Sequence, residues 1–207
     1  MVISRNLSKA IHMRHSLRRA ILVFTLLAFG PAMADEDRLG VPGPIDLAGS
    51  RYDLASSDES QPGYVEQDYL PEGQTLDRYE AMILVEFLKG KTTPADVVRP
   101  QVQMLDERRA TDPLVNYDIS MATEGDAILL DFILSGETEA GIRIAEWNAY
   151  RYVGGKNKDG AAGVWLVGIS RRAYGKDTTL FLTRLRDSRA GDVAAIVALN
   201  VPPKSAN

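Results

Sequence analysis

The chain of 207 residues contains no cysteine and only two histidines, His12 and His15. Both histidines lie in an N-terminal segment that is predicted to be removed. Without Cys or His, the remaining chain cannot build a Ser-His-Asp triad, a cysteine nucleophile, a Cys/His zinc site or an iron–sulfur cluster. The sequence therefore predicts no catalytic residue, no metal and no cofactor, and it favours a non-enzymatic protein.

The chain also lacks an apolar run long enough to span a membrane. Residues 20–29, AILVFTLLAF, form a run of ten residues, whereas a spanning helix needs about 20. Five basic residues and no acid precede this run, and Ala32-Met33-Ala34 fits a small-x-small cleavage site. This order is typical of a secretory signal. We therefore expect residues 1–34 to be a signal peptide cleaved after Ala34, starting at Met1 or Met13, and the mature protein to be periplasmic or secreted.

Basic residues are scarce in the mature chain. Cleavage leaves 173 residues with 19 Lys and Arg against 28 Asp and Glu, a net charge of −9. Nucleic-acid binding and adsorption to anionic lipid both need clustered basic side chains, so we expect neither. Because no disulfide can form, a hydrophobic core must hold the fold together.

The first part of the mature chain lacks a hydrophobic period. Residues 35–63 are rich in Gly, Pro, Ser and Asp and are predicted to be a flexible acidic tether. Ile45, Leu47, Tyr52 and Leu54 are the residues that could attach part of it to the domain. A single globular domain is expected over 64–200, followed by a tail at 201–207.

Alternating apolar residues and turn signals predict about six strands in that domain. The expected strands are 64–70, 79–88, 115–123, 127–134, 142–153 and 164–170. A helix is the competing interpretation of 79–88. Glu124-Gly125-Asp126 is expected to form a tight turn, and 154–163 a mobile hairpin loop. Most connections have hairpin length, so the sheet should be mostly antiparallel.

Two helices are expected to pack on this sheet. The first begins at Thr93-Pro94, a cap residue followed by proline, and runs to Arg108 or Arg109 after an interruption at Pro100. The second covers about 177–189. A short element of uncertain type follows at 193–199. The pattern predicts an α+β fold.

The order of these elements resembles that of PsbP-like domains. The resemblance covers about 64–190 and is carried by YLPEGQTLDRYEAMILVEF, a helix, a strand meander, and a C-terminal helix after SRRAYGKD. It implies an α-β-α sandwich, export across a membrane, and an accessory or protein-binding function. It implies no functional residue.

Charged residues inside apolar strands are the first candidate site. Glu86, Asp131, Arg143 and Glu146 lie in or beside strands that should be covered, and buried ions must be paired or hydrated. They could line a polar pocket on one sheet face. Two such acids could also catalyse hydrolysis of envelope glycans, which is the alternative function. Cross-strand ion pairs or a solvent-facing strand are the simpler interpretation.

A basic and aromatic cluster near the C-terminus is the second candidate site. A stretch of eight residues, 170–177, contains Arg171, Arg172, Tyr174 and Lys176, although the mature chain as a whole is acidic. Arg and Tyr are common anchors of interfaces. The competing interpretation pairs the two arginines with acids of the same domain. The leading hypothesis is an exported accessory protein that binds an envelope protein or a small polar ligand.

Overall fold

The computed structural model describes residues 36–121 and 126–201. The predicted signal peptide, the turn residues Glu124 and Gly125, and all but the first residue of the predicted tail lie outside these ranges. Within the described part of the chain, no helix combines the length and apolar character needed to cross a membrane.

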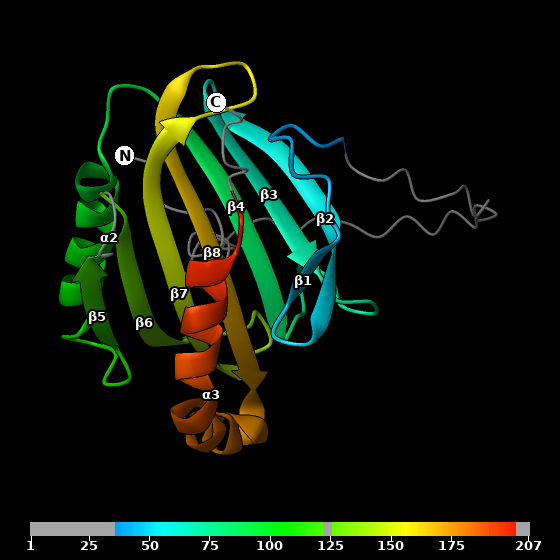
Figure 1. The fold of residues 1–207 in the computed structure, drawn as a ribbon. Coiled ribbons are helices and arrows are strands. Elements are labelled where there is room, and N and C mark those ends of the chain that lie inside the picture. Colours follow the sequence, from blue (N-terminus) through cyan, green and yellow to red (C-terminus); the bar gives the residue numbers. More distant parts are fainter. Residues whose placement is uncertain (1–35, 122–125, 202–207) are drawn as a thin grey trace, which may run out of the picture.

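One curled antiparallel sheet of eight strands forms the centre of the molecule (Figure 1). Its strands are β1 Ile45–Leu47, β2 Ser50–Gln61, β3 Tyr64–Leu70, β4 Ala81–Lys89, β5 Asn116–Met121, β6 Ile128–Glu137, β7 Arg143–Lys156 and β8 Ala162–Tyr174. The order is β1-β2-β3-β4-β8-β7-β6-β5. The sheet thus consists of two four-stranded meanders that meet where β4 pairs with β8.

The predicted α+β class and antiparallel sheet are confirmed, but the prediction of about six strands is wrong. The two additional strands, β1 and β2, lie in the segment that was predicted to be a tether. β2 pairs with β3 through two irregularities, near Ala55 and Ser60. Such bulges interrupt the alternation of side chains, and the polar sequence of β2 hides the strand from a search for hydrophobic period.

Side-chain hydrogen bonds also fix the segment before β1. Gln67 of β3 accepts hydrogen bonds from the backbone N–H groups of Arg38 (2.8 Å) and Leu39 (2.9 Å). The Asp37 carboxylate caps the turn by accepting from Gly40 and Val41, both at 2.9 Å. The described chain is therefore attached to the sheet from its first residues.

Helix α2, Pro94–Arg108, connects the two meanders. It begins as predicted, with a capping box between Thr93 and Asp96. The predicted interruption at Pro100 is wrong, because the helix continues through this residue. The buried residues Val98 and Leu105 hold the two halves of the helix against the same core, which offsets the hydrogen bond that proline cannot donate.

Helix α3, Thr178–Ala198, follows the short 3-10 turn η1, Gly175–Asp177. The predicted helix at 177–189 and the separate element at 193–199 are thus one helix of 21 residues. Gly191, a residue that weakens helix interiors by up to about 1 kcal/mol, does not end it.

The two helices cover opposite faces of the sheet. Ile83, Val85 and Phe87 of β4 share one core with Leu185 and Ile196 of α3. Met82 and Leu84, which alternate with them, share the other core with Val98 and Leu105 of α2. We call these the α3 face and the α2 face. Both tryptophans, Trp147 and Trp165, are buried on the α3 face.

One close packing contact joins β7 and β8. Gly168 lies directly opposite Tyr150, and a Cβ atom at Gly168 would come within 2.4 Å of the Tyr150 ring. The tyrosine ring therefore covers the space that a side chain at 168 would fill, and only glycine fits there.

Candidate functional site

Arg171 and Arg172, adjacent residues of β8, point to opposite faces of the sheet. On the α3 face, Arg171 forms an ion pair with Asp192 of α3 (Nη2 to Oδ1 2.7 Å) and donates a hydrogen bond to the Tyr52 hydroxyl (3.1 Å). Asp192 is buried. The first arginine of the predicted contact surface thus fastens α3 to the sheet.

On the α2 face, Arg172 pairs with Glu146 and lies 4.1 Å from the centre of the Tyr79 ring. Burial alone would lower the pKa of Arg172, but the Glu146 carboxylate and nearby tyrosines raise it above its usual value. Arg172 therefore stays charged, and its guanidinium orientation is set by both neighbours.

The other two residues of the predicted contact surface differ in exposure. Tyr174 is buried, and its hydroxyl donates to the Tyr79 carbonyl at 3.0 Å and accepts from the Tyr79 N–H at 3.3 Å. Lys176, in η1, is exposed. Of the four residues, Lys176 is the one whose side chain is free to meet a partner, and contact of this surface with a partner stays a prediction.

The four residues of the predicted polar pocket do not share one sheet face. Glu86 and Glu146 point to the α2 face, and Asp131 points to the α3 face. Asp131 accepts a hydrogen bond from Trp147 Nε1 (2.6 Å) and pairs with Arg189 of α3 (2.5 Å). Its burial is explained by these contacts and requires no ligand.

Glu86 is held separately from Glu146. It accepts a 2.5 Å hydrogen bond from the Tyr64 hydroxyl and lines a cavity of about 30 Å³ below α2, beside Gln101 and Tyr152. Burial, followed by the nearby Glu86 charge, raises the pKa of Tyr64 well above its usual value. This cavity has room for about one water molecule, and a sugar would not fit.

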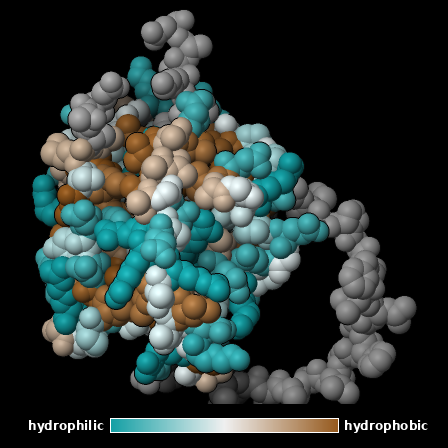
Figure 2. All heavy atoms as spheres, turned by 60° about the horizontal axis from the view of Figure 1, so that its bottom comes forward, coloured by the Kyte–Doolittle hydropathy of each residue, from teal (hydrophilic) through white to brown (hydrophobic). Residues whose placement is uncertain are grey.

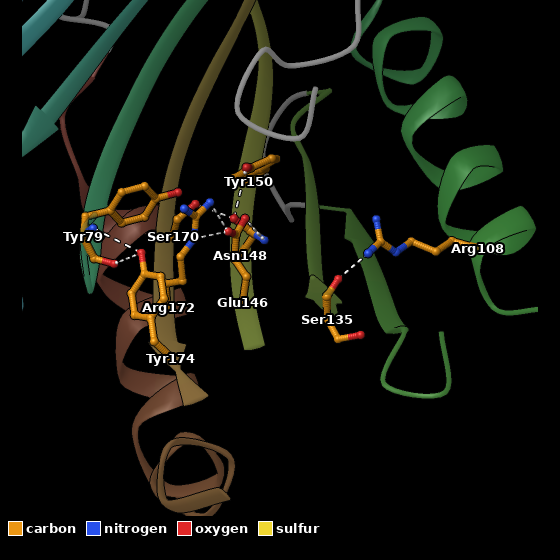
Figure 3. A network of polar contacts seen from close by, with 9 residues as sticks. All are labelled: Tyr79, Arg108, Ser135, Glu146, Asn148, Tyr150, Ser170, Arg172 and Tyr174. Carbon is orange, nitrogen blue, oxygen red and sulfur yellow. Dashed lines mark hydrogen bonds and ion pairs between the residues drawn. The ribbon is translucent and has the colours of Figure 1, made fainter. Parts of the chain in front are cut away.

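Glu146 belongs to a continuous polar network between β7 and β8 (Figure 3). Asn148 donates to Glu146 (3.2 Å) and accepts from the hydroxyls of Tyr150 (3.1 Å) and Ser170. Burial first, and then the Glu146 charge, raise the pKa of Tyr150, so this phenol stays protonated. The network is satisfied internally and fixes the position of the Glu146–Arg172 pair.

That pair forms part of the wall of a much larger groove of about 850 Å³. We call it the end groove, because it lies where α2 ends, β6 and β7 meet, and α3 begins. Its lining residues are Arg108, Thr111, Asp112, Pro113, Leu114, Leu134, Ser135, Gly136, Glu137, Arg143, Ile144, Ala145, Glu146, Arg172, Thr178, Thr179 and Leu182. Its volume lies within the range of small-molecule sites.

A second ion pair fixes the opposite wall. Arg108, in the last turn of α2, pairs with Asp112 (3.1 Å) and donates to the Ser135 carbonyl. Asp112 also accepts hydrogen bonds from the Ser135 N–H and hydroxyl, both at 2.8 Å. Burial would raise the pKa of Asp112, but the hydrogen bonds from Ser135, Leu114 and Arg108 outweigh it and lower the pKa.

The end groove has both apolar and polar lining residues, since Leu134 and Ile144 lie there beside charged side chains. Figure 2 views the end of the molecule that lies at the bottom of Figure 1, where hydrophobic and hydrophilic areas lie side by side. Figure 3 shows the Arg172–Glu146 group and the Arg108–Ser135 group as separate, pre-positioned parts. Such a surface can orient a polar ligand by directed hydrogen bonds while apolar residues contact the rest of it.

Only part of this groove could be found from sequence. Arg143 and Glu146 were predicted to line a polar pocket, and Arg172 was predicted to belong to a separate contact surface. Arg108 was predicted only as a helix end, because the contacts of Arg108 and Asp112 depend on Ser135, which is 23 residues from Asp112. No group of three or more potential Asp, Glu, His or Cys metal ligands occurs in the described ranges.

A protein-family model matches residues 39–201 of the chain. The chain belongs to the family that this model describes. The matched region starts before β1, so it includes the two strands that sequence reasoning assigned to a tether. No curated protein and no solved structure matches the chain. The resemblance to PsbP-like domains receives no support from these comparisons.

Proposed function

We propose that this protein is an exported, non-enzymatic binding protein that takes up a small polar ligand in the end groove. The observation that carries the proposal is the groove of about 850 Å³, with an arginine–carboxylate pair fixed on each of two walls. Pre-positioned polar groups lower the entropic cost of binding. Export and a periplasmic location are proposed from the predicted signal peptide.

The alternative function, a carboxylate-based glycan hydrolase, has no specific support. Such an enzyme needs two carboxyl groups about 5–9.5 Å apart on either side of an open cleft. Asp131 is engaged by Arg189, Glu146 by Arg172, and Glu86 by Tyr64. The acids that could do this chemistry are therefore held by other residues of the chain.

The experiment that tests the proposal fills the groove with a bulky side chain. Thr179 lines the groove on the first turn of α3, whereas Thr183, one turn later and also exposed, does not. Thr179→Trp and the matched control Thr183→Trp would be screened by thermal unfolding against sugars, carboxylates, amino acids and dipeptides. A ligand at a hundredfold excess over its Kd stabilises by about 2.7 kcal/mol.

We expect at least one compound to raise the Tm of the natural protein and of the Thr183 variant by about 5 °C or more. The Thr179 variant should lose this shift. Equal shifts in both variants would place binding outside the end groove and contradict the proposal. Arg171 and Arg172 are unsuitable for such a test, because both stabilise the fold.

A further inference from the structure

The charges of the end groove fall into two kinds, paired and unpaired. Six charged side chains line it, and four of them form the Arg108–Asp112 and Arg172–Glu146 pairs. The remaining two are Arg143 and Glu137. Neither side chain makes a hydrogen bond or an ion pair with another described residue, and both are exposed. The groove therefore offers one positive and one negative group to a ligand.

These two residues have fixed relative positions. Arg143 is the first residue of β7 and Glu137 the last residue of β6, and they are direct partners in the antiparallel register. Directly opposed residues of a sheet place their side chains on the same face, with Cβ atoms about 4.5–5.5 Å apart. A ligand that bridges them must carry opposite charges at a short separation.

The surroundings fit the same ligand. Thr178 and Thr179, in the first turn of α3, also line the groove, and the start of a helix favours a negative group. The α3 helix has no side chain capping its first turn. Leu134, Ile144 and Leu182 supply apolar surface beside these polar groups.

Resting on the function proposed above, we infer that the ligand is a small zwitterion of the amino-acid or short-peptide class. Its carboxylate contacts Arg143 on the side facing α3, and its ammonium group contacts Glu137. The already paired arginines and acids carry no net charge and line the walls. This balance of charges disfavours a ligand that is only anionic or only cationic.

The test uses L-alanyl-L-alanine and two analogues that each lack one charge. N-acetylation removes the positive charge, and C-amidation removes the negative charge. Calorimetric titration of the whole protein should give the tightest binding for the unmodified dipeptide, and at least tenfold weaker binding for each analogue. Arg143→Gln should weaken dipeptide binding at least tenfold, as should Glu137→Gln, because hydrogen bonds between charged groups are about twice as strong as those between neutral groups.

The matched controls are Arg99→Gln and Glu139→Gln, which change exposed residues outside the groove lining. Both should bind the dipeptide as the natural protein does. If one analogue binds as tightly as the dipeptide, a singly charged ligand is indicated and the zwitterion inference is overturned while the groove function stands. If no amino acid or dipeptide binds but a compound without opposite charges binds in a manner blocked by Thr179→Trp, the inference also fails. If nothing binds in the groove, both proposals fail.

Discussion

Helices α2 and α3 both bury apolar residues against opposite faces of the same sheet, but they differ in their caps and in their ion pairs with the strands. Helix α2 has local stabilisation, in its capping box, and a buried apolar contact through Val98 and Leu105. Helix α3 lacks a side-chain cap, and its contacts include the Arg171–Asp192 and Arg189–Asp131 pairs. The comparison indicates that local sequence specifies α2, whereas distant strand residues position α3.

A third arginine strengthens this contrast at the end of α3. Arg151 of β7 donates hydrogen bonds to the carbonyl groups of Val197 and Leu199, both at 3.0 Å, and also to that of Val201. The last carbonyl groups of a helix have no partner within it. Arg151 supplies partners from the sheet, so the end of α3 is also fixed by a residue distant in sequence.

The largest expected loss of stability comes from removing the buried charge of Asp192 in α3. Asp192→Asn leaves Arg171 without its ionic partner in a mostly buried position, and breaking a buried pair costs about 3–5 kcal/mol. Denaturant unfolding should show a loss of about 4 kcal/mol. Hydrogen exchange should accelerate in α3 more than in α2. A loss below about 1 kcal/mol, the level of an exposed pair, would contradict the role given to this pair.

The next largest loss of stability is expected from removing a buried apolar contact of α2. Leu105 is fully buried, and Leu→Ala substitutions in cores cost about 2.7–5 kcal/mol. We expect Leu105→Ala to lower the free energy of unfolding by about 3 kcal/mol, with faster hydrogen exchange in α2 first. If α3 lost protection before α2, the two helices would not be attached independently.

A smaller, pH-dependent loss of stability is expected on replacing Asp112, which follows α2 and pairs with Arg108 at the end of the helix. Its pKa is lowered in the folded protein, so its stabilisation is complete above the unfolded pKa of about 3.9. This stabilisation is lost as the pH falls through the folded pKa. Asp112→Asn should cost about 2 kcal/mol at pH 7, and the difference from the natural protein should shrink below about pH 4. A difference independent of pH would show that the charge is not what matters.

The cap of α2 should contribute less. Thr93 accepts a hydrogen bond from the Asp96 N–H at 3.2 Å, and replacement of a cap residue by Ala costs about 1 kcal/mol. Thr93→Ala should lower the free energy of unfolding by that amount, through a lower denaturant midpoint without a change in slope. An unchanged free energy of unfolding would show that the capping box does not stabilise α2.

The smallest effect is expected from an exposed ion pair of α2. Arg99 and Asp96 lie 3.3 Å apart with exposed side chains, and such pairs contribute at most about 1 kcal/mol. Arg99→Gln should change the free energy of unfolding by less than about 0.5 kcal/mol. A loss as large as that of Asp192→Asn would show that the burial of a pair does not decide its contribution.

Elements specified by local sequence, such as α2, could be predicted, whereas features that depend on distant residues, such as the length of α3, could not. The start of α2 was located because Thr93-Pro94 is a local signal, and β4 because its apolar residues alternate between two covered faces. The length of α3 was underestimated, since Asp192, a charged residue in an apolar segment, is explained only by Arg171 on a distant strand. β2 was missed because its pairing depends on the backbone of β3.

The candidate site was predictable only in pieces for the same reason. Buried acids in the strands were correctly recognised as unusual, but their partners come from other strands and from α3. Adjacent residues such as Arg171 and Arg172 could not be assigned to opposite faces before the limits of β8 were known. The end groove is formed where the ends of α2, β6, β7 and α3 come together, so no local sequence pattern predicts it.

One measurement tests the central claim, that the end groove is the ligand site, most directly. Backbone NMR spectra of the whole protein would be recorded during titration with L-alanyl-L-alanine. We predict that the largest shift changes occur in residues 108–114, 134–137, 143–146 and 178–182 and at Arg172, which line the groove. Saturable changes confined to other segments would contradict this assignment, whereas no changes at millimolar dipeptide would contradict the inference that the ligand is a zwitterion.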